Sequence, residues 1–250
     1  MKKYLLPALC FTLVTLSAKT FATPNCTVTK DSALENQLSK KEKKEGWQLL
    51  FNGQSLDKWR IYKNETGSSW KVQDGMICST KPAGNSNPDL ITSAMYENFE
   101  LEVDWKISAE GNSGIMYLVT EEYNHPYESG PEYQLIDDDG FPDKIEDWQK
   151  TGANYAMNVP MIRAIKTPGE WNHTVIIVNK GYVEHWLNGQ KVVEYELWND
   201  AWKKAKEEGK WKDAPGYGAA KSGHIAFQAS HSNVENTGVC FKNIKIKILK

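Results

Sequence analysis

The chain has 250 residues, a formal net charge of −2 and 25% charged residues, with lysines and acidic residues interspersed. This length suits one large β-domain or two small ones. The balanced charge gives no reason to expect a nucleic-acid or membrane-surface partner. The 10 tryptophans and 11 tyrosines form a heavy aromatic load, which suits a core and also a half-wet site that stacks on sugar.

Residues 1–22 are predicted to be a signal peptide. Two lysines open it, residues 5–18 are largely apolar, and residues 20–22 (Thr-Phe-Ala) offer a small-x-Ala cleavage site. The apolar stretch is short for a transmembrane helix, and no later stretch is apolar for long enough. We therefore expect an exported protein, periplasmic or secreted. A lipoprotein anchor at Cys10 or Cys26 is less favoured, because the residues before each are poor lipid-attachment contexts.

The mature chain is expected to start with a polar segment. Asp31–Glu45 is rich in Lys and Glu, so we expect residues 23–45 to be a tether or a short helix ahead of the domain. The domain is predicted to begin at Gly46 and to run to Lys250, because no linker-like gap and no internal repeat interrupts it.

Short strands dominate this domain. In Phe99–Ser108 apolar and charged residues alternate strictly, which predicts a half-buried antiparallel strand. Val175–Val178 is apolar on both faces and suits a central strand. Asn188-Gly189 predicts a type I′ hairpin turn between Val183–Leu187 and Gln190–Glu196.

The C-terminal part adds one helix and one irregular strand. Only Leu197–Glu208 is predicted as helix, capped by Asn199 or the next residue and ended by Gly209. The last strand, Val239–Leu249, has a phase break near Lys242-Asn243 that predicts a bulge. So many short strands with so little helix indicate an all-β sandwich or barrel.

Three long inserts separate predicted strands: Tyr123–Gly130, Asp137–Val159 and Trp198–Tyr217. Sites are usually built on such loops, so we expect the inserts at strand ends around the site. The second insert opens with Asp137–Gly140, whose three aspartates lack the full spacing of a calcium loop. An acidic turn is the favoured interpretation.

Two strands carry polar side chains on one face while the other face builds a core. Period-two geometry places Glu132 beside Gln134 in one strand, and His224 with Gln228 in another. With Gly-rich turns and aromatic residues nearby, two such strands favour a binding surface over a merely solvated face. The run Gly111–Gly114 is predicted to be a tight turn.

The strand Val183–Leu187 leaves two alternatives open. Its two faces separate His185 from Glu184 and Trp186. If the second set faces a groove, Glu184 and Trp186 are site residues and His185 is a core histidine. The reverse orientation makes His185 the functional group.

The cysteine count predicts no disulfide framework. Three cysteines remain after signal removal, namely Cys26, Cys78 and Cys240, and an odd count argues against a full set of bridges. Cys78 and Cys240 are able to pair in an oxidising compartment, but buried free thiols are at least as consistent with the sequence. No CxxC or HxxxH spacing indicates a structural zinc site.

Sequence runs spread over the domain share a family resemblance. They include GWQLLFNGQSLDKW, FELEVDWKIS, GNSGIMY, GPEYQLIDDDG, VEHWLNGQKVVEY, GHIAFQ and FKNIKIK, and they cover roughly Gly46 to Lys250. In this order they resemble the 3-keto-disaccharide hydrolase family. The resemblance implies a concanavalin A-like jelly-roll sandwich of two antiparallel sheets, here with one short helix, and a site on the concave sheet.

The resemblance also implies an enzyme that cleaves 3-keto-glycosides or 3-keto-disaccharides. A ketone at C3 acidifies the C2 proton, so a base removes it, the bond at C1 breaks by elimination, and water adds. Such a site needs a base, an acid for the leaving oxygen and donors near the enolate. It does not need the paired carboxylates of ordinary glycosidases, because no oxocarbenium ion forms.

We assign candidate roles within this scheme. The base is predicted to be Glu132 or His185, with Glu184 or His231 assisting the leaving group. The substrate-binding candidates are Gln134, Gln228, Trp186, Asn112 and Asp138. A divalent cation that polarises the ketone is compatible with the scheme, but no spacing demands one, so no cofactor or metal ligand is predicted. The expected partner is a small carbohydrate, and the sequence says nothing about oligomeric state.

Two other functions stay open. One is a non-catalytic carbohydrate-binding module, because jelly rolls host both roles. The other is a conventional glycosidase that uses paired carboxylates such as Glu132 and Glu184.

Overall fold

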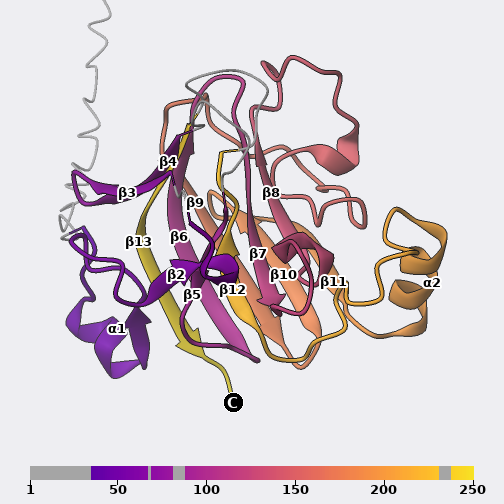
Figure 1. Cartoon of the computed structure of the whole chain (residues 1–250), viewed down its shortest axis with the longest axis horizontal. Helices are drawn as coiled ribbons and strands as arrows, with labels where there is room; N and C mark the ends of the chain where they lie inside the picture. The colour runs from indigo at the N-terminus through magenta and orange to yellow at the C-terminus, as the bar shows by residue number, and fades with distance from the viewer. Residues whose placement is uncertain (1–34, 67–68, 81–87, 231–237) are drawn as a thin grey trace, which may run out of the picture. The chain divides into compact units, whose positions relative to one another are not determined.

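The computed structural model describes residues 35–66, 69–80, 88–230 and 238–250, which form two antiparallel β-sheets packed face to face (Figure 1). The predicted all-β jelly-roll sandwich is therefore confirmed. The large sheet has the strand order β11-β10-β9-β6-β13-β4-β3, with β1 also paired to β13. The small sheet has the order β2-β5-β12-β7-β8.

The strands of the large sheet are β1 (Trp47–Leu49), β3 (Trp70–Gln73), β4 (Met76–Thr80), β6 (Phe99–Ile107), β9 (Asn172–Asn179), β10 (Tyr182–Leu187), β11 (Gln190–Glu196) and β13 (Gly238–Ile248). Those of the small sheet are β2 (Trp59–Ile61), β5 (Leu90–Thr92), β7 (Asn112–Val119), β8 (Glu132–Ile136) and β12 (His224–Phe227). The helices are α1 (Lys40–Lys44) and α2 (Asp200–Glu208), with single 3₁₀ turns η1 (Tyr62–Asn64), η2 (Pro126–Glu128) and η3 (Asp147–Gln149).

The core lies between the sheets. Every second residue of β6 is buried, as its alternation predicts, and Trp105 of this strand donates from Nε1 to Thr174 Oγ1 of β9 (2.8 Å). From the small sheet, Tyr133 and Leu135 of β8 enter the same core. Because side chains alternate across a strand, the remaining residues of β8 must lie on the outer face of the small sheet.

Local signals in the sequence produce the expected local structure. Asn188 and Gly189 both have positive φ angles (50° and 83°) and join β10 to β11, as a type I′ turn requires. β9 lies between β10 and β6, so it is an interior strand as predicted. The register of β13 against β6 shifts between Lys242 and Lys245, which confirms the bulge.

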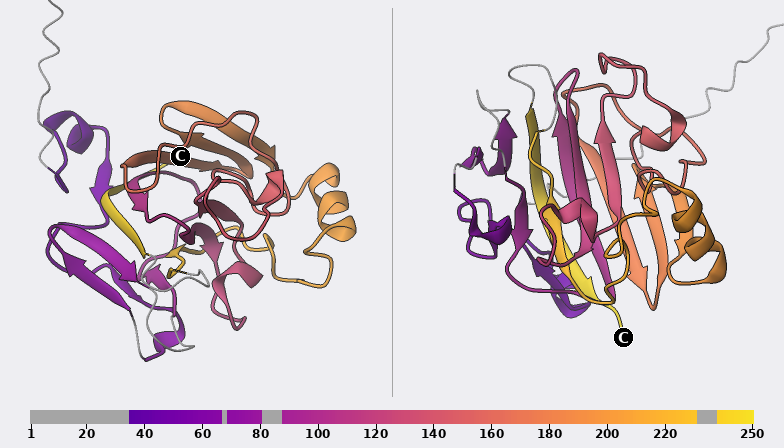
Figure 2. Two further views of the ribbon diagram at one scale, coloured as in Figure 1. Left: turned by 90° about the horizontal axis from the view of Figure 1, so that it is seen from above. Right: turned by 45° about the vertical axis from the view of Figure 1, so that its right-hand side comes forward.

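The predicted helix forms but begins later than expected. β11 ends at Glu196, and Trp198 has a φ of 67°, which excludes an α-helical conformation at this residue. Asn199 then caps α2 by accepting a hydrogen bond from the Trp202 amide (2.8 Å), and Gly209 follows its last residue. Figures 1 and 2 show α1 and α2 at opposite sides of the sandwich.

A disulfide links β4 to β13. Cys78 and Cys240 are directly paired in the register of these strands, with their Cα atoms 4.1 Å apart. The sequence left this pairing open, because the register that brings the two cysteines together is a long-range property.

Residues ahead of β1 also belong to the folded unit. Asn36 is buried, and it exchanges hydrogen bonds of 2.7 and 2.9 Å with Asn243 at the bulge of β13. The predicted signal peptide and most of the predicted tether lie outside the described residues. Among the described residues, no helix is long and apolar enough to cross a membrane.

Candidate active site

A cavity of about 700 Å³ opens on the outer face of the small sheet. Its volume lies in the range of small-molecule sites. β7, β8 and the residues after β12 supply its floor, and each of the three predicted inserts supplies an aromatic side chain to its wall: Tyr127, Tyr155 and Trp211. The inserts therefore lie around the cavity, as expected of loops at strand ends.

Glu132 is the most deeply buried carboxyl group of the cavity. It is 5% exposed, and its side chain lies across the backbone of Gly114 in the neighbouring strand. A Cβ atom on Gly114 would lie 2.1 Å from Glu132 Oε1. The prediction of a tight turn at Gly111–Gly114 is wrong, because β7 begins at Asn112 and includes Gly114. The missing side chain makes room for the carboxylate.

The carboxylate of Glu132 has no partner in the part of the chain that the structure describes. No described group donates a hydrogen bond to it, and no described cation forms a salt bridge with it. Burial raises the pKa of Glu132 to about 8, and the charge of Asp89 adds to this rise, whereas the Lys210 ammonium opposes it. A carboxyl group that titrates near neutral pH is suited to move protons.

Asp89 is a second cavity carboxylate, and sequence reasoning missed it. Its Oδ1 accepts a hydrogen bond from the Ala229 amide (2.8 Å). Burial raises the pKa of Asp89 to about 7, although the Ala229 amide opposes the rise. The residue precedes the three-residue strand β5, and such a short strand gives no periodicity from which its orientation follows.

Five amide side chains line the same space, and three of them were predicted from the sequence: Asn112, Gln134 and Gln228. Gln134 Nε2 donates to Asn112 Oδ1 (2.9 Å), which leaves the carbonyl of Gln134 and the amino group of Asn112 for a ligand. The backbone of Gln228 is fixed to β7, because its amide donates to the Gly114 carbonyl (2.9 Å). Together with Glu132 these are four of the predicted site residues, and the structure brings them together.

Aromatic rings and one lysine complete the wall. Trp211 stacks on Tyr217 with ring centroids 4.2 Å apart, and its Nε1 donates to the Tyr155 carbonyl (3.1 Å). Lys210 Nζ lies 4.2 Å from the centroid of the Tyr155 ring. Tyr127 is 36% exposed and stacks on His125. Partly exposed rings beside polar groups, as at Tyr127 and Tyr155, suit the apolar faces of sugars.

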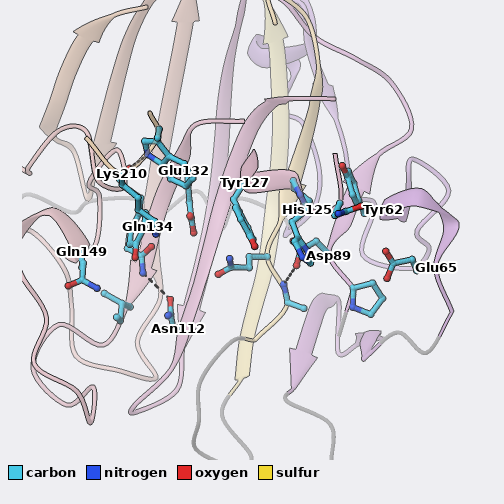
Figure 3. Close-up of a pocket in the computed structure, with 18 of the residues that line it drawn as sticks. Tyr62, Glu65, Asp89, Asn112, His125, Tyr127, Glu132, Gln134, Gln149 and Lys210 are labelled. Atoms are coloured by element: carbon cyan, nitrogen blue, oxygen red, sulfur yellow. Dashed lines mark hydrogen bonds between the residues drawn. The ribbon is translucent and has the colours of Figure 1, made fainter. Parts of the chain in front are cut away.

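Figure 3 shows how these groups share the cavity. Glu132, Gln134 and Lys210 lie on one side of Tyr127, and Asp89 with His125 on the other. The arrangement provides acid–base groups on two sides of a space lined by amides and rings.

Comparison with known proteins shows the family of the chain. The family model described as the 3-keto-alpha-glucoside-1,2-lyase-like domain matches residues 46–247. The chain belongs to this family. The resemblance drawn from the sequence runs is thereby confirmed.

Individual members of the 3-keto-alpha-glucoside-1,2-lyase-like family are also similar. A 3-keto-disaccharide hydrolase of Bacteroides thetaiotaomicron is 36% identical over 177 residues, which are 63% of this chain and 61% of the relative. The chain thus spans less than two thirds of that relative's length. A crystal structure of a candidate glycosyl hydrolase from Parabacteroides distasonis has a TM-score of 0.80 and 42% identity, covering 87% of this chain and all of that one. A second from the same organism has a TM-score of 0.63 and 26% identity, covering 81% and 99%.

His185 lies in the core rather than at the cavity. Its Nδ1 donates to the Gly152 carbonyl (2.9 Å), so Nε2 of the neutral ring accepts from the Tyr117 hydroxyl (2.8 Å). Burial lowers the pKa of His185 to about 4. Both ring nitrogens are occupied, so the structure does not place this histidine where it can act as the base.

Glu184 and Trp186 lie on the outer face of the large sheet. Trp186 Nε1 donates to Glu184 Oε2 (2.7 Å), and Lys191 pairs with the same carboxylate. Neither residue lines the cavity, which opens from the other sheet. The structure therefore does not bring Glu184 and Glu132 together as a carboxylate pair.

Asp138 also lies away from the cavity. Its Oδ1 accepts from the Thr151 amide (2.9 Å), and Arg163 lies 3.8 Å from Oδ2. It holds the second insert in place, as an acidic turn does. His231 lies outside the described residues. Within the described ranges, no group of three or more His, Cys, Asp or Glu side chains is placed to hold a metal ion.

Proposed function

We propose that the protein is an exported enzyme that cleaves the glycosidic bond of 3-keto-glycosides, including 3-keto-disaccharides. The observation that carries the proposal is Glu132, an unpaired buried carboxylate in a cavity of about 700 Å³ lined by amides and aromatic rings. Family membership and the similarity to a 3-keto-disaccharide hydrolase support the substrate class. The Cys78–Cys240 disulfide supports export, because disulfides persist in oxidising compartments.

Glu132 is the base of the proposed reaction. Its ionised form removes the C2 proton of a bound 3-keto sugar, and the electron pair delocalises onto the C3 carbonyl oxygen. A carboxylate with a pKa of about 8 is a stronger base than one in water, since the protein does not solvate its charge. The amide groups of Asn112 and Gln228 supply donors for the enolate oxygen or for neighbouring hydroxyls.

Glu132→Gln tests the proposal. The variant keeps the size and shape of the side chain but removes the base, so we expect kcat/KM on a methyl 3-keto-glucoside to fall by about 10²–10⁴-fold. The measurement is the release of 3-keto-glucose and methanol, with circular dichroism to show that the variant is folded. Full activity of the folded variant would remove Glu132 from this role.

The substrate range separates this function from the two alternatives. Wild-type enzyme is expected to cleave a 3-keto-disaccharide and to leave the unoxidised disaccharide intact. Cleavage of the plain sugar would instead indicate a conventional glycosidase. Binding of either sugar without turnover would indicate a carbohydrate-binding module.

A further inference from the structure

Asp89 faces the cavity that holds Glu132, from the other side of Tyr127 (Figure 3). One of its oxygens, Oδ1, is fixed by the Ala229 amide at 2.8 Å. No lysine, arginine or histidine of the described ranges forms a salt bridge with Asp89 or with Glu132. Both carboxylates are thus held without a counter-cation, whereas Glu65, the third carboxylate of the cavity lining, is exposed to solvent.

The fold alone does not require an acid at this position. Among the described residues, the side chain of Asp89 makes one hydrogen bond, from the Ala229 amide, and the side-chain oxygen of an asparagine would accept it equally well. Burying a carboxylate without a cation lowers the stability of the folded protein. If the residue served only this contact, an amide side chain would therefore give a more stable protein.

We propose that Asp89 is the second acid–base residue of the site and works in turn with Glu132. This inference rests on the proposed cleavage of 3-keto-glycosides. Asp89 gives a proton to the leaving oxygen during elimination, and its carboxylate then activates the water that adds.

The elimination step balances with these two residues. Glu132 takes the proton from C2, the electron pair of that bond forms a double bond between C1 and C2, and the bond from C1 to the leaving oxygen breaks. Asp89 protonates that oxygen, so the leaving group departs as an alcohol. The proton has moved from Asp89 to the product, and Glu132 now carries the one from C2.

The hydration step restores both residues. The Asp89 carboxylate takes a proton from water while the water oxygen bonds to C1, and Glu132 returns its proton to C2. One water is consumed, the free 3-keto sugar forms, and the pair regains its starting protonation. Two carboxyl groups sharing one proton therefore suffice for both steps.

The electrostatics of the cavity support such sharing. Burial raises the pKa of Asp89 to about 7, and the charge of Glu65 adds to this rise. Burial raises the pKa of Glu132 to about 8, and the charge of Asp89 adds to that rise. Between these two pKa values the pair holds about one proton, mainly on Glu132, which has the higher pKa. The reactive form, with Glu132 ionised and Asp89 protonated, is the less populated arrangement of this same proton. The other titratable groups that line the cavity are Tyr62, Glu65, His125, Tyr127, Tyr155 and Lys210.

The leaving group provides the decisive test. A nitrophenolate departs without an acid, whereas an alkoxide does not, so Asp89→Asn is compared on p-nitrophenyl and methyl 3-keto-glucosides. We expect kcat/KM of the variant to fall by about 10²–10⁴-fold on the methyl substrate and by less than about tenfold on nitrophenolate release. Glu132→Gln, the matched control, is expected to lose activity on both substrates, because both need the C2 proton removed.

The nitrophenyl substrate also reports folding, since an unfolded variant would not eliminate it. Wild-type enzyme is expected to give a bell-shaped pH profile on the methyl substrate and a profile without the alkaline fall on nitrophenolate release. Equal losses of Asp89→Asn on both substrates, or full activity on the methyl one, would overturn the assignment of Asp89. If the wild type cleaved neither 3-keto substrate, the proposed function itself would fail, and this inference with it.

Discussion

At the scale of single residues, the candidate site depends on a position that has no side chain. A Cβ on Gly114 would lie 2.1, 2.8 and 2.9 Å from Oε1, Cδ and Cγ of Glu132. All three atoms belong to one flexible side chain, so the strand itself would accept an alanine. The carboxylate, however, would have to leave its present position.

Gly114→Ala is therefore expected to separate activity from stability. A displacement of about 1 Å at a catalytic group costs on the order of 10²-fold, so kcat/KM on a 3-keto-glucoside should fall by about that factor. The free energy of unfolding should change by less than about 1 kcal/mol, because alanine restricts the unfolded chain more than glycine does. Urea denaturation and steady-state kinetics measure the two quantities.

The double variant with Glu132→Gln is the control for this prediction. If Gly114 acts only by making room for the carboxylate, the added alanine should not slow the Glu132→Gln protein further. A further tenfold loss in the double variant would show that the glycine has a different role.

The sequence predicted those site residues that lie on regular strands. Glu132 and Gln134 follow from alternation in β8, and Gln228 follows the short strand β12, so period-two geometry is informative there. Asp89, Lys210 and Trp211 come from irregular segments or an insert, where no periodicity orients a side chain. His185 shows where alternation is not enough. The sequence left open which face of its strand lines a site, and in the structure the face with His185 points into the core, where this residue is fully buried.

At the scale of elements, the insert Trp198–Tyr217, which contains α2, places two side chains in the wall of the cavity. Asn199 starts the helix and Gly209 follows its last residue, so Lys210 and Trp211 are delivered to the cavity wall directly after the helix ends. The sequence predicted the helix and its caps from local pattern. It did not predict which side chains after the helix reach the site, because that depends on the packing of Trp211 against Tyr217.

Lys210→Met is expected to shift the pH dependence of catalysis. The Lys210 ammonium lowers the pKa of Glu132, so removing the charge raises that pKa and delays formation of the base as pH increases. The acid limb of the kcat/KM profile should move to higher pH, and the loss of activity should be larger at pH 6 than at pH 9.

Lys210→Arg keeps the charge and serves as the matched control, with a profile close to that of the wild type. Profiles measured on nitrophenolate release isolate the elimination step. An acid limb that stays in place in the methionine variant would contradict the electrostatic link between Lys210 and Glu132.

At the scale of the whole molecule, the two sheets have separate tasks. The small sheet supplies the cavity floor on its outer face, and its inner face packs on the large sheet through residues such as Tyr133, whose hydroxyl donates to the Trp186 carbonyl (3.3 Å). The large sheet contains the disulfide, in strands whose cysteines do not line the cavity. The disulfide is therefore expected to stabilise the large sheet, on which the small sheet packs, without contacting the residues of the cavity.

The double variant Cys78→Ala/Cys240→Ala tests this separation. The bridge joins positions 162 residues apart, so it restricts the unfolded chain over most of the domain. Its removal is expected to lower the free energy of unfolding by about 2–5 kcal/mol. At 25 °C, the folded variant should keep kcat/KM within about twofold of the wild type, since substitutions far from a site and without shared contacts have little effect on it.

Urea denaturation with and without dithiothreitol checks the cause of the lost stability. The reductant should destabilise the wild type and leave the double variant unchanged. A wild type that is equally stable after complete reduction would show that the bridge contributes nothing to the sandwich.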